Sequence, residues 1–217
     1  MSIEMIRMSK THVTRLFVGG MIAAAAGLIL GVAALWVALA SDAIGLGGKH
    51  VIDVNGGSGA WTALGIHLGD LMVSFAGAST RVAARTASQI FPAPAEDFVG
   101  ADIDFANGAR GRITCLSTPP FYARFTLIGD RGWVEVQEGG NVDKGLPSTF
   151  VHCKPDGSRE SRGYAPVNTV RMNFEAWADA VEGRAPYRVT PAHLIANIGI
   201  LDAVTRSAAA DGTPVAL

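Results

Sequence analysis

The chain has 217 residues, of which 49% are hydrophobic and 17% are charged, and its formal net charge is −1. Because binding to phosphate backbones needs a basic surface, this balance excludes an electrostatically driven nucleic-acid partner. The roughly 150 residues beyond residue 59 are enough for one domain with a sizeable core.

Residues 1–16 form a polar, basic tail, and residues 17–40 follow without a single charged side chain. As a helix with a rise of about 1.5 Å per residue, the apolar segment would extend about 36 Å, enough to cross a hydrocarbon core of about 30 Å. Arg7, Lys10 and Arg15 precede it, and the positive-inside rule then puts the N-terminus in the cytoplasm. The segment predicts one transmembrane helix and a single-pass membrane protein.

Other interpretations of residues 17–40 stay open at this point. Ala38-Leu-Ala40 before Ser41 resembles the cleavage site of a signal peptide, and a long buried helix of a soluble domain is a further alternative. If an unrelated segment was joined to the gene near residues 55–63, the protein would be cytoplasmic.

Residues 41–59 are rich in glycine and predict a linker with a short strand at 51–54. A helix is expected from Ala60 to Phe75, at the start of a domain that spans residues 60–217. An alternative makes Ala60–Gly77 a second membrane span, but Asp70 at its centre would then cost about 2.5–3.5 kcal/mol on insertion scales.

The middle of the chain predicts hairpins. Asn107-Gly108 is a strong turn signal between two runs of strand-forming residues, 102–106 and 110–117. Gly129 to Gly132 separates a second pair of runs, 122–128 and 133–137. A further hairpin is expected around Thr149–Cys153.

Two helices and a terminal strand are predicted at the C-terminal end. Phe174, Trp177 and Val181 recur at helical spacing, and Gly183 follows where a left-handed residue would end that helix. Thr190-Pro191 supplies an N-cap and a proline at the first position of the second helix. Its expected apolar stripe comprises Leu194, Ile198, Leu201 and Thr205, so that the two helices would form a hairpin with one apolar seam. Gly212 ends the second helix before the strand.

Hairpins followed by helices predict an α+β fold: a mostly antiparallel open sheet with helices on one face, preceded by one transmembrane helix. The terminal helices can cover only one face of the sheet. The other face is expected to expose apolar side chains, some of them from Phe121, Phe125, Leu127 and Trp133. An exposed apolar face of this kind predicts a homodimer through the sheet.

Six short sequence motifs resemble those of a known family, both in their residues and in their order along the chain. They are Gly65-Ile-His-Leu-Gly-Asp70, Phe105 to Gly111, Phe125 to Val136, Glu175–Trp177–Ala180 with Gly183–Pro186, Thr190 to Ser207-Ala208, and Gly212–Val215. Together they span about residues 64–217. This part of the chain resembles the C-terminal domain of the glucose–fructose oxidoreductase/inositol dehydrogenase (Gfo/Idh/MocA) family, which implies a sugar or polyol as the substrate.

The resemblance implies catalytic roles for His67 and Asp70, which match the family's G-x-H-x-x-D helix. At a spacing of three residues on a helix, the carboxylate could orient the imidazole, which would accept the proton of a substrate hydroxyl. Ala63 stands where the family has an acidic residue, and the E-K-P motif with its lysine is missing. A His–Asp pair that only supports the fold therefore stays open as an alternative.

A dinucleotide-binding fingerprint is missing from the sequence. The nearest string, from Val51 to Thr62, has spaced glycines at Gly57 and Gly59 but Thr62 at the third position of G-x-G-x-x-G. The expectation is that no cofactor binds to this chain alone, although the family implies NAD or NADP. The predicted function is therefore the substrate-binding and oligomerisation domain of an oxidoreductase, inactive alone. The alternative is a membrane-anchored binding or scaffold protein that pairs with a full-length family enzyme.

Other reactive side chains do not form a recognisable site. His12, His50, His152 and His193 are scattered, so no metal site is predicted. Cys115 and Cys153 could pair in an oxidising compartment or remain unpaired, partly buried thiols, and both alternatives stay open.

Overall fold

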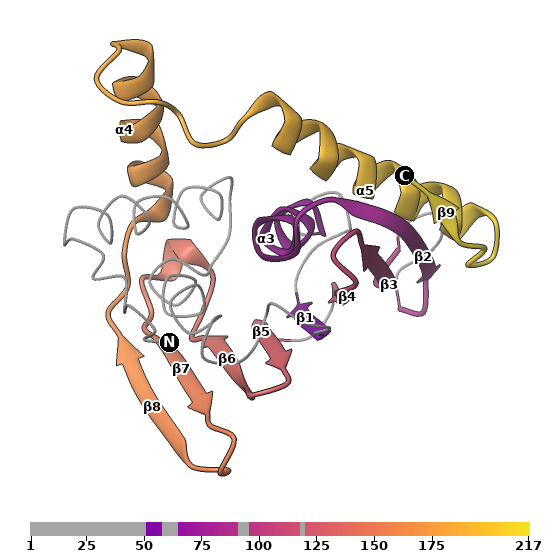
Figure 1. The fold of residues 1–217 in the computed structure, drawn as a ribbon, viewed down its shortest axis with the longest axis horizontal. Coiled ribbons are helices and arrows are strands. Elements are labelled where there is room, and N and C mark those ends of the chain that lie inside the picture. Colours follow the sequence, from indigo (N-terminus) through magenta and orange to yellow (C-terminus); the bar gives the residue numbers. More distant parts are fainter. Residues whose placement is uncertain (1–50, 58–64, 91–95, 118–119) are drawn as a thin grey trace, which may run out of the picture.

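The computed structural model describes residues 51–57, 65–90, 96–117 and 120–217. Three helices, one short 3₁₀ helix and nine strands make up these residues (Figure 1). In chain order they are β1 (Val51–Gly57), α3 (Ile66–Ala76), β2 (Ser79–Ala87), β3 (Phe98–Phe105), β4 (Arg110–Leu116), β5 (Tyr122–Gly129), β6 (Gly132–Glu138), η3 (Val142–Lys144), β7 (Ser148–Cys153), β8 (Arg159–Tyr164), α4 (Thr169–Val181), α5 (Pro191–Ala209) and β9 (Val215–Ala216).

The strands form one sheet in the order β8-β7-β6-β5-β1-β4-β3-β2-β9. Every neighbouring pair is antiparallel except β1 and β4, which run parallel. The predicted α+β fold with a mostly antiparallel sheet is confirmed. Strand β1 falls where the sequence predicts a linker with a short strand, and it lies at the centre of the sheet between β4 and β5.

The two predicted hairpin turns are confirmed. In the β3–β4 turn, Gly108 has a φ of 87°, and the backbone N–H of Ala109 donates a hydrogen bond to the Asn107 side chain. In the β5–β6 turn, Gly132 has a φ of 131°, and a Cβ added to it would lie 2.2 Å from the Cys153 carbonyl oxygen. Glycine is required there both by the backbone conformation and by the close approach of β7.

Helices α3 and α5 lie on one face of the sheet, and the core is packed between them and the strands. Phe125 and Leu127 of β5 stand opposite Val136 and Val134 of β6, and all four side chains are buried on this face. The ring centroid of Phe125 lies 5.4 Å from that of Phe75 on α3. The prediction that Phe125 and Leu127 could face outward is wrong, because the two-residue period of β5 puts them on the helix side.

The other face of the sheet has a mixed surface. Trp133 of β6 lies on this outer face, and the Arg159 guanidinium stacks over its ring at 5.3 Å. Leu116, Tyr122 and Ile128 are also exposed there. Phe121, which was also predicted as a candidate for this face, packs against the core instead.

Helix α5 confirms the predicted cap but not the predicted stripe. The backbone N–H of His193 donates to the Thr190 hydroxyl, and Pro191 opens the helix. Leu194 and Ile198 are each 52% exposed, whereas the buried side chains of α5 are Asn197, Ile200, Ala203, Val204 and Ser207. Small residues at 203 and 207 let the helix approach β2 closely, which explains why this side faces inward.

The predicted helical hairpin is wrong. In Figure 1, α4 stands at the β7–β8 end of the molecule, whereas α5 lies along β2 and α3. Phe174 and Trp177 on α4 are 66% and 55% exposed, so the apolar stripe of α4 does not meet α5. The predicted end of α4 holds, since Gly183 has a φ of 72°. The terminal strand is also confirmed as β9, which pairs with β2.

The predicted single-pass membrane localisation is corrected by the structure. Among the residues described above, none of the helices combines the length and apolarity needed to cross a membrane. The transmembrane helix was predicted for residues 17–40, which lie outside the described residues. The basic tail, residues 1–16, lies outside them as well.

Candidate functional site

His67 lies in the first turn of α3, where the sequence predicted a catalytic histidine. Its side chain is half-buried, and burial lowers the pKa of its imidazole. The lowered pKa favours the neutral ring, the form that can accept a proton. Gly65 precedes the helix and supplies no side-chain cap to it.

Asp70 is buried one turn further along α3, and its partner comes from α5. The Nε2 atom of His193 lies 2.8 Å from Asp70 Oδ1, while the Asp70 side chain is only 5% exposed. The two atoms are within hydrogen-bonding distance, and the contact becomes an ion pair when the imidazole is protonated. Burial raises the pKa of Asp70, and the charge of His193 opposes that rise.

The structure therefore changes the partner of Asp70. The sequence predicted that Asp70 orients His67, but within the described residues its ion pair joins it to His193. His193 belongs to the first turn of α5, three residues after the cap Thr190. Sequence spacing cannot find this partner, because residues 70 and 193 meet only when α5 packs against α3.

Close packing at Gly69 brings the two helices together. A Cβ at Gly69 would lie 2.9 Å from Asn197 Oδ1 on α5, a distance that real Cβ atoms do not show. Asn197 lies one turn beyond His193 on the same side of α5. The missing side chain at Gly69 therefore lets α5 approach α3 near both residues. Gly69, which stands at a variable position of the G-x-H-x-x-D segment, thus has a structural reason: it lets α5 pack close to α3, where His193 contacts Asp70.

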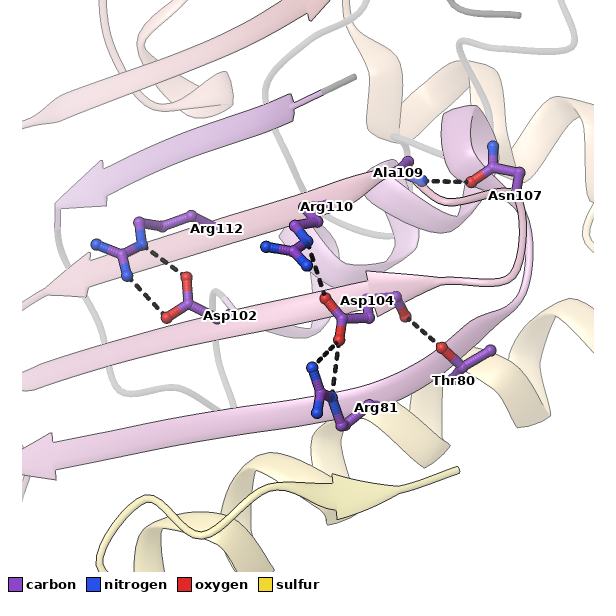
Figure 2. A network of polar contacts seen from close by, with 8 residues as sticks. All are labelled: Thr80, Arg81, Asp102, Asp104, Asn107, Ala109, Arg110 and Arg112. Atoms are coloured by element: carbon purple, nitrogen blue, oxygen red, sulfur yellow. Dashed lines mark hydrogen bonds and ion pairs between the residues drawn. The ribbon is translucent and has the colours of Figure 1, made fainter. Parts of the chain in front are cut away.

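The outer face of the sheet carries a second polar cluster, on β2, β3 and β4 (Figure 2). Arg81 pairs with Asp104, which also faces Arg110 at 3.7 Å. Asp102 accepts two hydrogen bonds from Arg112, at 2.8 and 2.7 Å. We call these five residues the charged cluster. They leave positive and negative groups alternating on an exposed surface, which is suited to contact with a complementary protein face.

The N-termini of α4 and α5 do not form a dinucleotide site. The Asn168 side chain caps α4 by accepting from Arg171 N, and the Thr190 side chain caps α5 by accepting from His193 N. These caps occupy amides that a pyrophosphate would need, and neither helix is preceded by a glycine-rich loop. The N-termini of α4 and α5 therefore do not fit a dinucleotide.

Neither cysteines nor metal ligands add a site in the part of the chain that the structure describes. Cys115 and Cys153 are free and buried: Cys115 lies in the core, and Cys153 ends β7 beside Trp133. Burial raises the pKa of the Cys115 thiol to about 12, which makes it unreactive. The described part of the chain also contains no group of three histidine, cysteine or carboxylate side chains placed to hold a metal.

Residues 40–135 match the model of the GFO/IDH/MocA C-terminal domain. This match includes the G-x-H-x-x-D segment and the strands from β1 to the first half of β6. No curated protein has a significant sequence match to this chain.

Solved structures show that the fold of this GFO/IDH/MocA-like domain continues beyond residue 135. An aldose–aldose oxidoreductase from Caulobacter crescentus, complexed with glycerol, superposes with a TM-score of 0.66 at 16% identity and covers 92% of this chain. An oxidoreductase from Agrobacterium radiobacter, in complex with NAD⁺, L-tartaric acid and magnesium, has a TM-score of 0.64 at 18% identity and also covers 92%. The WlbA dehydrogenase from Bordetella pertussis, in complex with NADH and UDP-GlcNAcA, has a TM-score of 0.63 at 19% identity and covers 85%.

The chain spans only part of these relatives. It covers 61%, 62% and 60% of the three solved chains, respectively. At these identities the likeness establishes the fold and not the substrate.

Proposed function

We propose that residues 60–217 are the substrate-binding and oligomerisation domain of a Gfo/Idh/MocA-like, NAD(P)-dependent oxidoreductase that acts on a sugar or polyol. The observation that supports this most is the half-buried His67 at the start of α3, in the domain whose sequence matches the family model. In this proposal His67 accepts the proton of a substrate hydroxyl. Burial favours the neutral imidazole that this role needs.

Asp70 has a positioning role in this proposal. Its carboxylate is paired with His193, which ties α3 to α5 and so fixes the helix from which His67 projects. Asp70 does not need to touch the substrate for this role. Both predicted site residues thus remain in the proposed site, but with different tasks.

Nicotinamide chemistry is not assigned to any residue of this chain. The capped N-termini of α4 and α5 do not fit a dinucleotide, and the G-x-G-x-x-G fingerprint is missing from the sequence, so in this proposal the NAD or NADP of the family is not bound by the substrate site. We expect the chain alone to bind neither NAD(H) nor NADP(H) and to be inactive alone. Calorimetry at millimolar cofactor should show no saturable heat, and a micromolar dissociation constant would contradict this expectation.

Binding of small polyhydroxy compounds tests the substrate side of the proposal. Ligand-observed NMR on the full chain should detect glycerol, myo-inositol or D-glucose with millimolar affinity. His67→Ala should weaken that binding several-fold, because a hydrogen bond to the ligand is lost. The matched control is His152→Ala, which removes a half-buried histidine of β7. If none of the three probes binds to the unmodified chain, the proposed function fails.

A second candidate is a scaffold protein that pairs with a full-length family enzyme. The charged cluster on the outer face favours it, because alternating charges give specificity to a protein contact. A homodimer through the same outer face belongs to the main proposal. Co-purification with a family enzyme, without binding of any polyol, would favour the scaffold over the oxidoreductase domain.

A further inference from the structure

A small cavity lies at one end of the sheet, between the β6–β7 connection and the N-terminus of α4. Its volume is about 30 Å³, which holds about two water-sized groups. It is lined by described residues from the end of β6, the β6–β7 connection, the start of β7 and the segment that leads into α4, and its polar side chains are Glu138, Asn141, Ser148 and Thr169. None of them belongs to the His67–Asp70–His193 site, and the sequence analysis did not single them out.

Two buried oxygen atoms in the lining of this cavity have no hydrogen-bond partner. They are Oε1 of Glu138, at the end of β6, and Oγ1 of Thr169, the first residue of α4. Thr169 is only 3% exposed, and Ser148, opposite Glu138 in the register, is 9% exposed. Because buried polar groups in proteins are almost always paired, two unpaired oxygens beside one cavity indicate a ligand that supplies the missing partners.

The charges around the cavity select the kind of ligand. Burial raises the pKa of Glu138 to about 8, so its carboxyl is largely protonated at neutral pH and can donate as well as accept. A cation is disfavoured because the N-terminus of α4, the positive end of its helix dipole, lies at the cavity. Glu138 is also the sole acidic group in the lining described here. An anion is disfavoured because the lining described here contains no lysine, arginine or histidine to pair with it. A neutral hydroxyl group, which both donates and accepts, complements Glu138 and Thr169.

A larger groove adjoins the cavity and gives room for the rest of such a ligand. It measures about 380 Å³, within the range of small-molecule sites, and shares Val142, Gly145, Pro166 and Val167 with the cavity. Asp143 and Asn168 add polar groups at its edge. Apolar side chains with a few polar groups suit a sugar or polyol, whose carbon skeleton is less polar than its hydroxyls.

We propose that Glu138 and Thr169 form a subsite that binds one hydroxyl group of a neutral polyhydroxy ligand, the remainder of which lies in the groove between Val142 and Val167. This assignment rests on the proposed function for the identity of the ligand as substrate. The subsite supplies orientation and affinity. Specificity follows because an analogue that lacks the hydroxyl leaves both protein oxygens unpaired.

The test uses the full chain and the polyol that binds most tightly among glycerol, myo-inositol and D-glucose. Thr169→Val keeps the shape of the side chain and removes its hydroxyl, and Glu138→Gln keeps the shape and removes the acid. We expect Thr169→Val to weaken binding five- to tenfold and Glu138→Gln to weaken it two- to fivefold, since an amide still offers a donor and an acceptor. Exposed positions give the matched controls Thr149→Val and Glu96→Gln, which should change the affinity less than twofold.

Backbone amide NMR adds a readout that does not depend on the variants. Addition of the polyol should shift the amides of Gly140 and Gly145 in the β6–β7 connection. If the polyol binds but both variants stay within twofold of the unmodified chain, or if the shifted amides lie elsewhere, the subsite is overturned and the proposed function stands. If none of the polyols binds, the proposed function and the subsite both fail.

Discussion

Asp70 is a buried carboxylate that depends on a partner from another helix. Removal of the imidazole in His193→Ala would leave Asp70 without its ion pair, and we expect a loss of about 2–3 kcal/mol in the free energy of unfolding. Asp70→Asn in the same background should recover part of the loss, because a neutral amide is less costly to bury. Urea denaturation at pH 7 measures both effects.

A double-mutant cycle decides whether the two side chains interact. Additive effects of His193→Ala and Asp70→Asn, within about 0.3–0.5 kcal/mol, would contradict the pair. His152→Ala serves as the control, since it removes a half-buried histidine that lies away from Asp70.

Glu138 should make stability depend on pH in a direction opposite to that of a paired carboxylate. Its pKa is raised from 4.5 to about 8 by burial, so between these values the folded state binds more protons than the unfolded state. The free energy of unfolding should therefore fall as the pH rises from about 5 to 8, by at most about 1.4 kcal/mol per unit of pKa shift. Glu138→Gln should flatten this decline in thermal melts at pH 5, 6.5 and 8, and an unchanged slope would contradict it.

The sequence predicted which residues form the candidate site but not which side chains they contact. His67 and Asp70 could be singled out because their spacing on one helix matches a known motif. The pairing of Asp70 with His193 depends on an approach of two helices that are separated by more than a hundred residues. Glu138 and Thr169 carried no signal, because a lone glutamate at a strand end and a threonine at a helix start are ordinary on a solvated surface.

The buried hydroxyl of Ser207 connects α5 to the sheet through hydrogen bonds. The backbone N–H of Ala84 on β2 donates to Ser207 Oγ at 2.8 Å, and Ser207 donates to the Thr213 carbonyl at 2.7 Å. Ser207→Ala should lower the free energy of unfolding by about 1–3 kcal/mol, because it leaves the amide of Ala84 unpaired. Urea denaturation checks this. Ser161→Ala on the exposed strand β8 is the control, and an equal change in both variants would show that the hydroxyl is unimportant.

Sequence periodicity predicted where the helices occur better than it predicted which side they bury. Turn and cap residues act locally, so Asn107-Gly108, Thr190-Pro191 and Gly183 could be read directly. The buried side of α5 consists of small or polar residues such as Ala203 and Ser207, which a search for large apolar side chains overlooks. Strand β2 was not predicted, since Val82 is its single large apolar residue among small and polar ones, which is a weak strand signal.

The outer face of the sheet is the surface proposed for self-association. Ion pairs such as Arg112–Asp102 lie beside exposed apolar side chains, including Ile128 and Leu116. We expect the full chain to sediment as a dimer or larger at tens of micromolar. Arg112→Glu places two negative groups side by side and should shift the protein towards the monomer, more strongly at low salt.

The exchanged pair Arg112→Glu with Asp102→Arg is the control for this experiment. It keeps one charge of each sign on the face and should restore part of the association. A monomeric wild-type protein over the same concentration range would show that the outer face has no role in self-association.

The central position of β1 has a consequence for how the chain is made. Strands β2, β3 and β4 form one ribbon and β5 to β8 form another, and β1 alone joins the two within the sheet. Val51 pairs with Arg110 on one side and Ile128 on the other, so its partners are translated about 60 to 80 residues later. Strand β1 leaves the ribosome before its partners are synthesised. Its two edges can be fully hydrogen-bonded only after both β4 and β5 have been made. Such long sequence separation slows folding, so pulse-labelled hydrogen exchange should find the amides of β1 among the last to be protected.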